Sequence, residues 1–499
     1  MVITMAIDIL LSHLYFNLQT LLLFGVVFLT AIWWMSGPKN LPPGPTPLPI
    51  IGNLFHFFGK KNYKVFYEIF QNYGGICTVY LGRARTILIT DINIVKETAT
   101  KQADNFSDRF LPPVLAWTVG SDGSLFFQNG PVWKERRKFT MQALRNFGVG
   151  KKSLEYKINE EARCLMDVMT GIEGPFDPSE YTTLTIANVI CNINFGKRFD
   201  YKDKHFQDII NRFRFLIASV SLTGLPNSFP FLLRTPLYSH IGRSLDYMKA
   251  YIGGHLKEHQ QTLNEDDVRD YIDMYLLEIK RQQESGEEVI FKPEQAWRAI
   301  MEIFGGGTDT TTNTLLYGIL LTSLHTEVQD KVQEEIDRVI GTNRQPSYED
   351  RTNMPYTEAV LMEIQRFRPV VVIVPPHGVF HDTQLAGYNI PKGSQIFVNL
   401  WGIFHDPKVW KNPDQFDPTH FLSDDGKTLN RREELIPFGI GRRSCVGEHL
   451  AKMELFLFFT NLMQRFKFSL PDEDPIPCLD PDVSVLARPA KFRVCVAQR

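Results

Sequence analysis

The residues best suited to chemistry lie in a glycine-rich segment near the C-terminal end, residues 438–447, which reads FGIGRRSCVG. The segment begins with Phe438 and places Cys445 between glycines, behind Arg442 and Arg443, and before the apolar run of residues 450–462. Glycines let a backbone approach a flat, rigid group, and the amides at a helix start stabilise a thiolate over a thiol. Two interpretations are open: a thiolate that binds a metal, or a structural cysteine at a turn.

A second segment, residues 304–312, reads FGGGTDTTT and lies in a helical pattern that begins at Pro293 and continues towards Ile340. Three successive glycines destabilise a helix by about 2 to 3 kcal/mol relative to alanine, so another interaction must offset them. Either the helix breaks here and Thr308 or Asp309 caps a second helix, or a flat ligand packs against the face that lacks side chains.

The spacing Phe-x-x-Gly-x-Arg-x-Cys-x-Gly resembles the haem-binding segment of cytochrome P450, the family of haem-thiolate monooxygenases. The resemblance covers essentially the whole chain, and residues 41–53, 354–357 and 436–455 are most similar to the microsomal family-2 type. It implies haem b as the cofactor, Cys445 as the thiolate ligand to its iron, and Phe438 as part of the haem-binding loop.

The threonine segment matches the oxygen-activation motif of the same family. The resemblance implies that Gly306 lies against the haem, that Thr310 hydrogen-bonds dioxygen, and that Asp309 relays protons to it. An acid beside a hydroxyl in an otherwise apolar wall suits proton delivery without admitting bulk water.

Haem has two propionates, and their burial requires cations or hydrogen-bond donors. Trp133 and Arg137 resemble the propionate-binding helix motif of the family, and Arg443 comes from the cysteine segment. Arg109 and His377 are further candidates by a looser match. Each of these residues alone could be a solvated surface group, and for Arg109 and His377 that interpretation is as strong as the functional one.

Glu363 and Arg366 lie three residues apart in a helical pattern and therefore face one another. They resemble the Glu-x-x-Arg core pair of the family, whose third member is usually an arginine. Here His420 occupies that position, and its charge depends on pH. We expect all three residues to be structural.

The N-terminal part of the chain predicts a membrane anchor. Residues 14–35 have no formal charge, and as a helix they would span about 33 Å, enough for a bilayer. A secretory signal is the alternative, but the stretch lacks a basic n-region and a small-residue cleavage site. We expect residues 1–36 to be the anchor, 37–53 a proline-rich hinge, and 54–499 a haem-binding monooxygenase domain on the cytosolic face of the endoplasmic reticulum membrane.

The remaining elements are mostly helical in pattern. Residues 76–81 and 86–90 predict a β-hairpin, and helices are expected at residues 131–144, 153–169, 203–222, 237–263 and 268–283, besides the long helix from Pro293. The predicted fold class is mainly α with a small β-rich lobe, as in cytochrome P450, preceded by an N-terminal transmembrane helix.

Net charge and cysteine content limit which partners and which cell compartment are expected. The net charge of −2, from 54 basic and 56 acidic residues, gives no reason to expect nucleic acid. Six scattered cysteines without a Cys-x-x-Cys pair suit a reducing compartment. A group of basic residues is predicted to dock an acidic flavoprotein reductase, with cytochrome b5 as a second candidate partner: Lys134, Arg136, Lys138, Arg431, Arg432, Arg442 and Lys452.

Apolar segments point to lipids, though core packing explains them too. Residues 222–233 form an uncharged connector, which suits either core or a shallow membrane contact. Arg212 and Arg214 suit either a fatty-acid carboxylate or a solvated helix face. The segments that match substrate-contact regions of the family are apolar: residues 111–117, Phe126, 213–217, Phe304, 370–374 and 483–485.

The resemblance implies that one oxygen atom from dioxygen is inserted into a lipophilic small molecule, namely a fatty acid or eicosanoid, a steroid or a xenobiotic. Electrons would come from NADPH through the reductase. Two alternatives are a haem-thiolate isomerase or dehydratase, which acts on lipid peroxides without a reductase, and a non-enzymatic haem sensor. Asp309 and Thr310 argue against both, since neither needs a proton relay.

Overall fold

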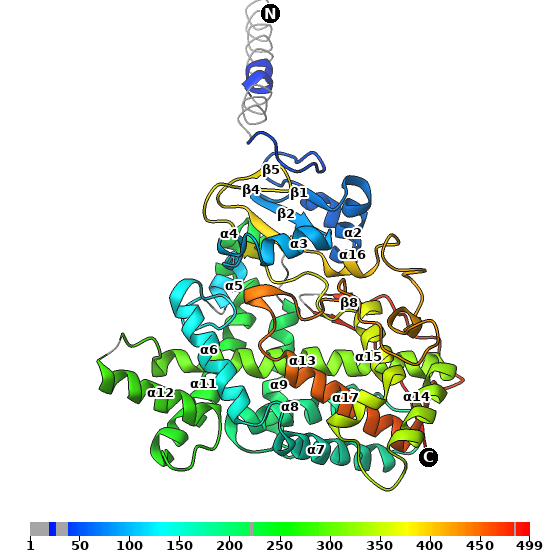
Figure 1. Ribbon diagram of the computed structural model, residues 1–499. Coiled ribbons are helices and arrows are strands. Elements are labelled where there is room, and N and C mark those ends of the chain that lie inside the picture. Colours follow the sequence, from blue (N-terminus) through cyan, green and yellow to red (C-terminus); the bar gives the residue numbers. More distant parts are fainter. Residues whose placement is uncertain are drawn as a thin grey trace, which may run out of the picture.

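The computed structural model describes residues 19–25, 38–118, 120–219, 221, 223–286, 288–483 and 486–499. Helices form most of the molecule, and the larger sheet lies next to the N-terminal segment (Figure 1). The long helix α13 (Pro293–Leu324) crosses the helical body and packs against α8 (Ser179–Phe195) and α17 (Glu448–Arg465).

The other helices and the strands have the following bounds. The α-helices are α2 (Asn62–Tyr73), α3 (Ile92–Ala99), α4 (Ala103–Phe106), α5 (Pro113–Thr118), α6 (Gly130–Asn146), α7 (Lys152–Thr170), α9 (Lys204–Ser219), α10 (Leu225–Ser228), α11 (Ser239–Thr262), α12 (Tyr271–Ser285), α14 (Thr326–Val339), α15 (Pro355–Phe367) and α16 (Leu400–Phe404). The 3-10 helices are η1 (Leu54–Phe57), η2 (Pro230–Arg234), η3 (Pro236–Tyr238), η4 (Tyr348–Asn353), η5 (Pro418–Phe421) and η6 (Gly441–Arg443). The strands are β1 (Ile76–Leu81), β2 (Ala84–Ile89), β3 (His377–Gly378), β4 (Thr383–Leu385), β5 (Tyr388–Ile390), β6 (Gln395–Val398), β7 (Phe466–Ser469), β8 (Asp482–Val483), β9 (Ala487–Arg488) and β10 (Cys495–Gln498).

A sheet with the strand order β1-β2-β6-β3 forms the centre of the β-rich lobe. Strands β1 and β2 form an antiparallel hairpin that pairs Ile76 with Ile89, and β6 joins β2 in parallel. Val79 and Ile87 are completely buried, because apolar side chains pack on the sheet. The predicted hairpin is confirmed, although its second strand begins two residues earlier, at Ala84.

Five predicted helices are confirmed with ends that differ by a few residues. They are α6, α7, α9, α11 and α12. Helix α8 was not among the predicted helices. Thirteen of its seventeen residues are buried, so its sequence lacks the alternation of polar and apolar faces that marks an amphipathic helix.

The long helix differs from its prediction in two ways. It continues through Gly305, Gly306 and Gly307, so the interpretation in which the helix breaks at the glycines is wrong. It ends at Leu324, so the prediction of one helix as far as Ile340 is also wrong. His325 has non-helical dihedral angles, and its carbonyl accepts the first bonds of α14. The turn lets the amphipathic α14 lay its apolar side on α17.

The predicted anchor falls largely outside the described part of the chain. Of residues 14–35, only 19–25 are described. None of the helices that the structure describes combines the length and the apolar character that a membrane crossing requires.

Candidate active site

The loop before α17 holds Cys445 in a tight turn. The Cys445 backbone N–H donates to the Phe438 carbonyl oxygen at 2.8 Å. Gly439 and Gly441 have φ angles of 69° and 76°, which favour glycine. A Cβ atom on Gly441 would lie 2.6 Å from the Ala99 carbonyl oxygen, so the loop also requires glycine where it approaches α3.

The Cys445 sulfur is surrounded by protein yet accessible. Its side chain is exposed, although burial among neighbouring atoms is the first cause of its altered pKa. Exposure to solvent and burial among protein atoms are compatible if Cys445 faces an internal cavity that solvent can enter. Burial raises the thiol pKa, whereas the Gly447 amide and the Arg137 guanidinium lower it by less. The amide and the cation therefore both favour the thiolate that is expected at this position.

The three glycines of α13 serve different contacts. A Cβ atom on Gly305 would lie 1.6 Å from the Phe213 ring of α9, and one on Gly307 would lie 2.5 Å from Ile190 of α8. Gly306 is exposed, and its Cβ would meet only Phe126, at 3.5 Å. Protein side chains thus account for two glycines, and only Gly306 opens to space that a flat ligand could occupy.

Asp309 and Thr310 are adjacent on α13, but their side chains form hydrogen bonds with other residues. The Thr310 hydroxyl donates to the Gly306 carbonyl oxygen at 2.6 Å. The Asp309 carboxylate accepts from Nε of Arg214 at 3.2 Å. Burial raises the pKa of Asp309, and the Arg214 charge opposes that shift. The acid and the hydroxyl are thus adjacent, and each has its own partner.

Arg443 and Arg137 approach the same indole ring. The Arg443 guanidinium lies 3.5 Å from the centre of the buried Trp133 ring, and that of Arg137 lies 5.9 Å away. Arg443 also donates to the carbonyl oxygens of Ser107 at 2.9 Å and Gln128 at 2.8 Å. Nη2 of Arg137 donates to the Ser444 hydroxyl at 3.3 Å, next to Cys445. The structure therefore brings these three predicted residues together beside the cysteine loop.

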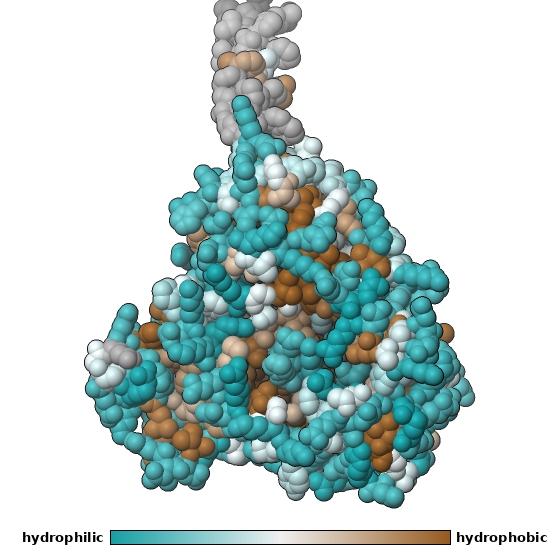
Figure 2. Space-filling model, viewed as in Figure 1, coloured by the Kyte–Doolittle hydropathy of each residue, from teal (hydrophilic) through white to brown (hydrophobic). Residues whose placement is uncertain are grey.

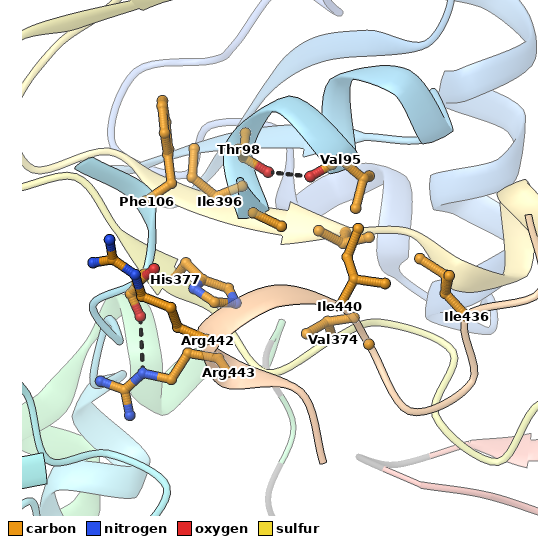
Figure 3. A pocket seen from close by; sticks show the side chains of 14 residues that line it. Val95, Thr98, Phe106, Val374, His377, Ile396, Ile436, Ile440, Arg442 and Arg443 are labelled. Carbon is orange, nitrogen blue, oxygen red and sulfur yellow. Dashed lines mark hydrogen bonds between the residues drawn. The ribbon is translucent and has the colours of Figure 1, made fainter. Parts of the chain in front are cut away.

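Arg109 and His377 belong to the same cluster. Burial and the charges of Arg443 and Arg137 lower the pKa of Arg109 to about 9. Burial and the neighbouring Arg109 lower the pKa of His377 well below its ordinary value. Buried Nε of Arg109 and buried Nδ1 of His377 have no hydrogen-bond partner in the described part of the chain. His377 and Arg443 line a pocket between α3, β6 and the cysteine loop (Figure 3).

The cluster has the chemistry of an anion site. The charges of Arg443 and Arg137 lower the pKa of Arg109, and the Arg137 charge also lowers that of Arg443, which forms an ion pair with Asp108 at 3.8 Å. Two unpartnered buried ring or guanidinium nitrogens remain. A group with two carboxylates, such as haem b, would satisfy both needs. The described residues therefore fit this cofactor.

Glu363, Arg366 and His420 form the expected buried structural group. Arg366 donates to both Glu363 oxygens at 2.7 Å, and it also donates to the backbone carbonyl of Phe404 at 2.8 Å. Nδ1 of His420 lies 3.2 Å from Glu363. These bonds tie α15 to η5 and to the loop before it, on the way to the cysteine segment.

Sequence reasoning placed Arg136 on the basic surface, and this is wrong. Arg136 is buried, and its Nη2 donates to the Ile290 carbonyl and to Gln295 at 2.6 Å each. The residue lies three positions after Trp133, on the inner face of α6. Lys134 and Lys138 of the same helix are exposed.

Sequence reasoning named Arg214 as a possible binder of a substrate carboxylate but did not foresee its ion pair with Asp309. It missed Glu302 altogether. Glu302 of α13 accepts from the Ser124 hydroxyl at 2.5 Å and the Leu125 amide at 2.6 Å, and burial raises its pKa to about 7. The isolated acid of Glu302, four residues before Gly306 in an apolar helix, was the available sequence signal.

Comparison with known proteins agrees with this geometry. A family model described as Cytochrome P450 matches residues 42–496. Cytochrome P450 2U1 of Homo sapiens is 36% identical, with 96% of this chain and 93% of the relative covered. Cytochrome P450 2J5 of Mus musculus is 38% identical over 97% of both chains. Cytochrome P450 2C16 of Oryctolagus cuniculus is 41% identical, with 92% and 94% covered. The chain therefore belongs to the cytochrome P450 family, as a family-2-type monooxygenase that uses haem b with a cysteine thiolate as axial ligand.

Proposed function

We propose that the enzyme inserts one oxygen atom from dioxygen into a lipophilic small molecule, with electrons from NADPH delivered by a flavoprotein reductase. The observation that carries this proposal is the exposed Cys445 beside a cluster of three arginines, whose positive charge Asp108, 3.8 Å from Arg443, offsets in part. Cys445 is the proposed thiolate ligand, and its loop, including Phe438, holds the sulfur in place.

The anion cluster is the proposed propionate site. Arg109, Arg137 and Arg443 supply charge, Trp133 orients two of the guanidinium groups, and His377 supplies a neutral donor. When bound, haem supplies the redox-active iron that activates dioxygen. Gly306 provides the open face of α13 against which the flat group can lie.

Asp309 and Thr310 are the proposed proton-delivery pair. Burial favours the protonated form of Asp309, so this carboxyl can hold a proton near neutral pH more readily than an exposed aspartate. The Thr310 hydroxyl can turn from the Gly306 carbonyl to pass a proton onward. The apolar wall around them limits the entry of water.

The proposed substrate is apolar because one aromatic ring contacts the open glycine and two more lie at the neighbouring positions of α13. Phe126 contacts the Gly306 position, and Phe213 packs edge-to-face on Phe304. Fatty acids or eicosanoids, steroids and xenobiotics all fit this chemistry. The pairing of Arg214 with Asp309 argues against Arg214 as a binder of a substrate carboxylate.

The proposed reductase contact lies on exposed basic residues near the cysteine loop, with cytochrome b5 as a second candidate partner. Lys134, Lys138, Arg442 and Lys452 are exposed. Their positive charge would attract an acidic flavoprotein and orient it during association.

We also propose that residues 1–36 anchor the enzyme in the endoplasmic reticulum membrane, that 37–53 form a hinge, and that 54–499 form the monooxygenase domain. Ile50 and Phe231 are both 66% exposed. The segments that hold Ile50 and Phe231 both lie near Leu81. Gly52 forms an isolated β-bridge with Leu81, and the Ser228 hydroxyl donates to the Leu81 carbonyl oxygen. Apolar side chains also appear on the β-rich lobe in the upper part of the view (Figure 2). This surface suits a second, shallow membrane contact.

Full-length enzyme reconstituted with reductase and NADPH, and screened against fatty acids, steroids and aromatic drugs, tests the proposal. Mass spectrometry should detect products that gain one atom from labelled dioxygen and that form only with reductase and NADPH. Rearranged products of lipid peroxides formed without reductase would instead support an isomerase or dehydratase.

A further inference from the structure

A small internal cavity lies where four helices meet. Helix α13 packs against α8 and α11, and α11 packs against α9 (Figure 1). Each of the four helices contributes buried side chains to the cavity wall, among them Cys191 of α8, Phe206 and Ile209 of α9, Met248 and Ile252 of α11, and Phe304 of α13. The room inside suits a single small molecule.

The lining of this cavity is almost wholly apolar. Cys191 and Tyr251 carry the only side-chain hydrogen-bonding groups among the residues that line it. Burial raises the pKa of Cys191 well above its ordinary value, so its side chain stays a neutral thiol and packs as a small hydrophobic group. A buried water needs two to four polar partners, and an apolar cavity that lacks them stays dry and binds apolar molecules such as xenon.

The cavity is connected with the proposed active site by apolar contacts. Phe304 lines the cavity two residues before Gly306, and its ring packs edge-to-face on Phe213, with ring centres 6.2 Å apart. The Phe213 ring in turn lies against Gly305. Motion of these rings can admit an apolar diatomic molecule, whereas a polar molecule would lose its hydrogen bonds along the same contacts.

We propose that the cavity is a docking site for dioxygen, from which this small apolar molecule reaches the open face of α13. Dioxygen matches the apolar lining and the small size of the cavity, and it is the one apolar diatomic molecule that the proposed reaction consumes. The role of the cavity in supplying dioxygen rests on the proposed function, but its ability to bind an apolar molecule does not.

Full-length holoenzyme and four variants test the proposal. Cys191→Leu fills the cavity from α8, and Ile209→Phe fills it from α9 in case the first variant does not fold. Ile209→Ala enlarges the cavity. Cys164→Leu is the matched control, because Cys164 lies on α7 and does not line the cavity.

The first measurement uses xenon as the probe and needs no turnover. Crystals pressurised with xenon should show an anomalous peak among Ile209, Met248 and Phe304. The peak should be stronger in Ile209→Ala, absent from the filled variants and unchanged in Cys164→Leu. Ordered water in the cavity, or no xenon in either wild type or Ile209→Ala, would contradict the site.

The second measurement is the rate at which dioxygen associates with the reduced holoenzyme, followed by stopped-flow absorbance. The filled variants should associate several-fold more slowly than wild type and Cys164→Leu. Xenon should slow wild type but not the filled variants.

The two measurements separate the inference from the proposed function. If xenon binds but neither filling nor xenon changes dioxygen association, the cavity does not supply dioxygen and the inference is overturned, while monooxygenation stands. If filling slows association but no labelled oxygen atom enters any product, the docking site stands and the proposed function is contradicted.

Discussion

His420 directs both ring nitrogens at acceptors. Nδ1 lies 3.2 Å from the Glu363 carboxylate, and Nε2 lies 2.7 Å from the Lys411 carbonyl oxygen. Only an imidazolium can donate to both. Burial lowers the pKa of His420, but Glu363 outweighs it, so the pKa is raised from 6.5. The histidine can therefore replace the usual arginine only while it is protonated.

The raised pKa predicts a pH-dependent stability. The contribution of His420 should be complete below pH 6.5, the ordinary histidine value, and should be lost as pH rises through the higher folded-state pKa. His420→Arg keeps a permanent charge, so its free energy of unfolding should fall less over that interval. Denaturant titrations of both proteins at several pH values measure the difference. Identical pH dependence would contradict the imidazolium assignment.

Thr310 offers a second prediction at the scale of one side chain. Thr310→Ala removes the hydroxyl that now donates to Gly306, and we expect NADPH consumption to continue while product falls several-fold and peroxide rises. Thr310→Ser retains the hydroxyl and should retain most of the coupling. Paired assays of NADPH, product and peroxide measure this, and a fully coupled alanine variant would contradict the relay role.

The glycines of α13 have two different roles: Gly305 packs against a protein side chain, whereas Gly306 faces open space. Gly305→Ala should destabilise the protein by about 1 to 3 kcal/mol, because the new Cβ overlaps the buried Phe213 ring at 1.6 Å. Gly306→Ala meets only an ordinary contact with Phe126 at 3.5 Å, so the apoprotein should gain up to about 1 kcal/mol from helix propensity.

Chemical denaturation of the two apoproteins, followed by haem titration, tests this contrast. Gly306→Ala should bind haem more weakly although its fold is intact. Equal destabilisation by both substitutions would show that the glycines have one common role.

Local patterns predicted the elements, but not what each element packs against. Amphipathic helices such as α6 and α7 were predictable because one face is polar, whereas α8 is buried almost all round and has no such period. The turn at His325 depends on how α14 packs against α17, which no local pattern records. The same limit explains Arg136 and Arg214, whose partners come from distant helices.

Candidate site residues could be predicted from the spacing of a sequence motif where they lie in the same segment of the chain. Cys445 with Arg443, and Asp309 with Thr310, could be named from their motifs. The convergence of Arg109 and His377 on the Trp133 helix required tertiary structure, since these residues come from three distant parts of the chain.

At the scale of the whole molecule, exposed charge should control electron supply. Lys134→Glu/Lys138→Glu, on the outer face of α6, should raise the KM for reductase several-fold and flatten its salt dependence. Lys257→Glu, exposed on α11, is the control and should leave this KM unchanged. Reductase titrations at two salt concentrations measure both, and equal effects would place the docking surface elsewhere.

The central claim is that Cys445 holds the haem iron as a thiolate while a separate arginine cluster holds the propionates. The difference spectrum of the reduced, carbon-monoxide-bound holoenzyme tests it most directly. Wild-type enzyme should show the thiolate-type band, and Cys445→Ala should lose it even where haem remains bound by the arginine cluster. An unchanged thiolate-type spectrum in Cys445→Ala would contradict the account.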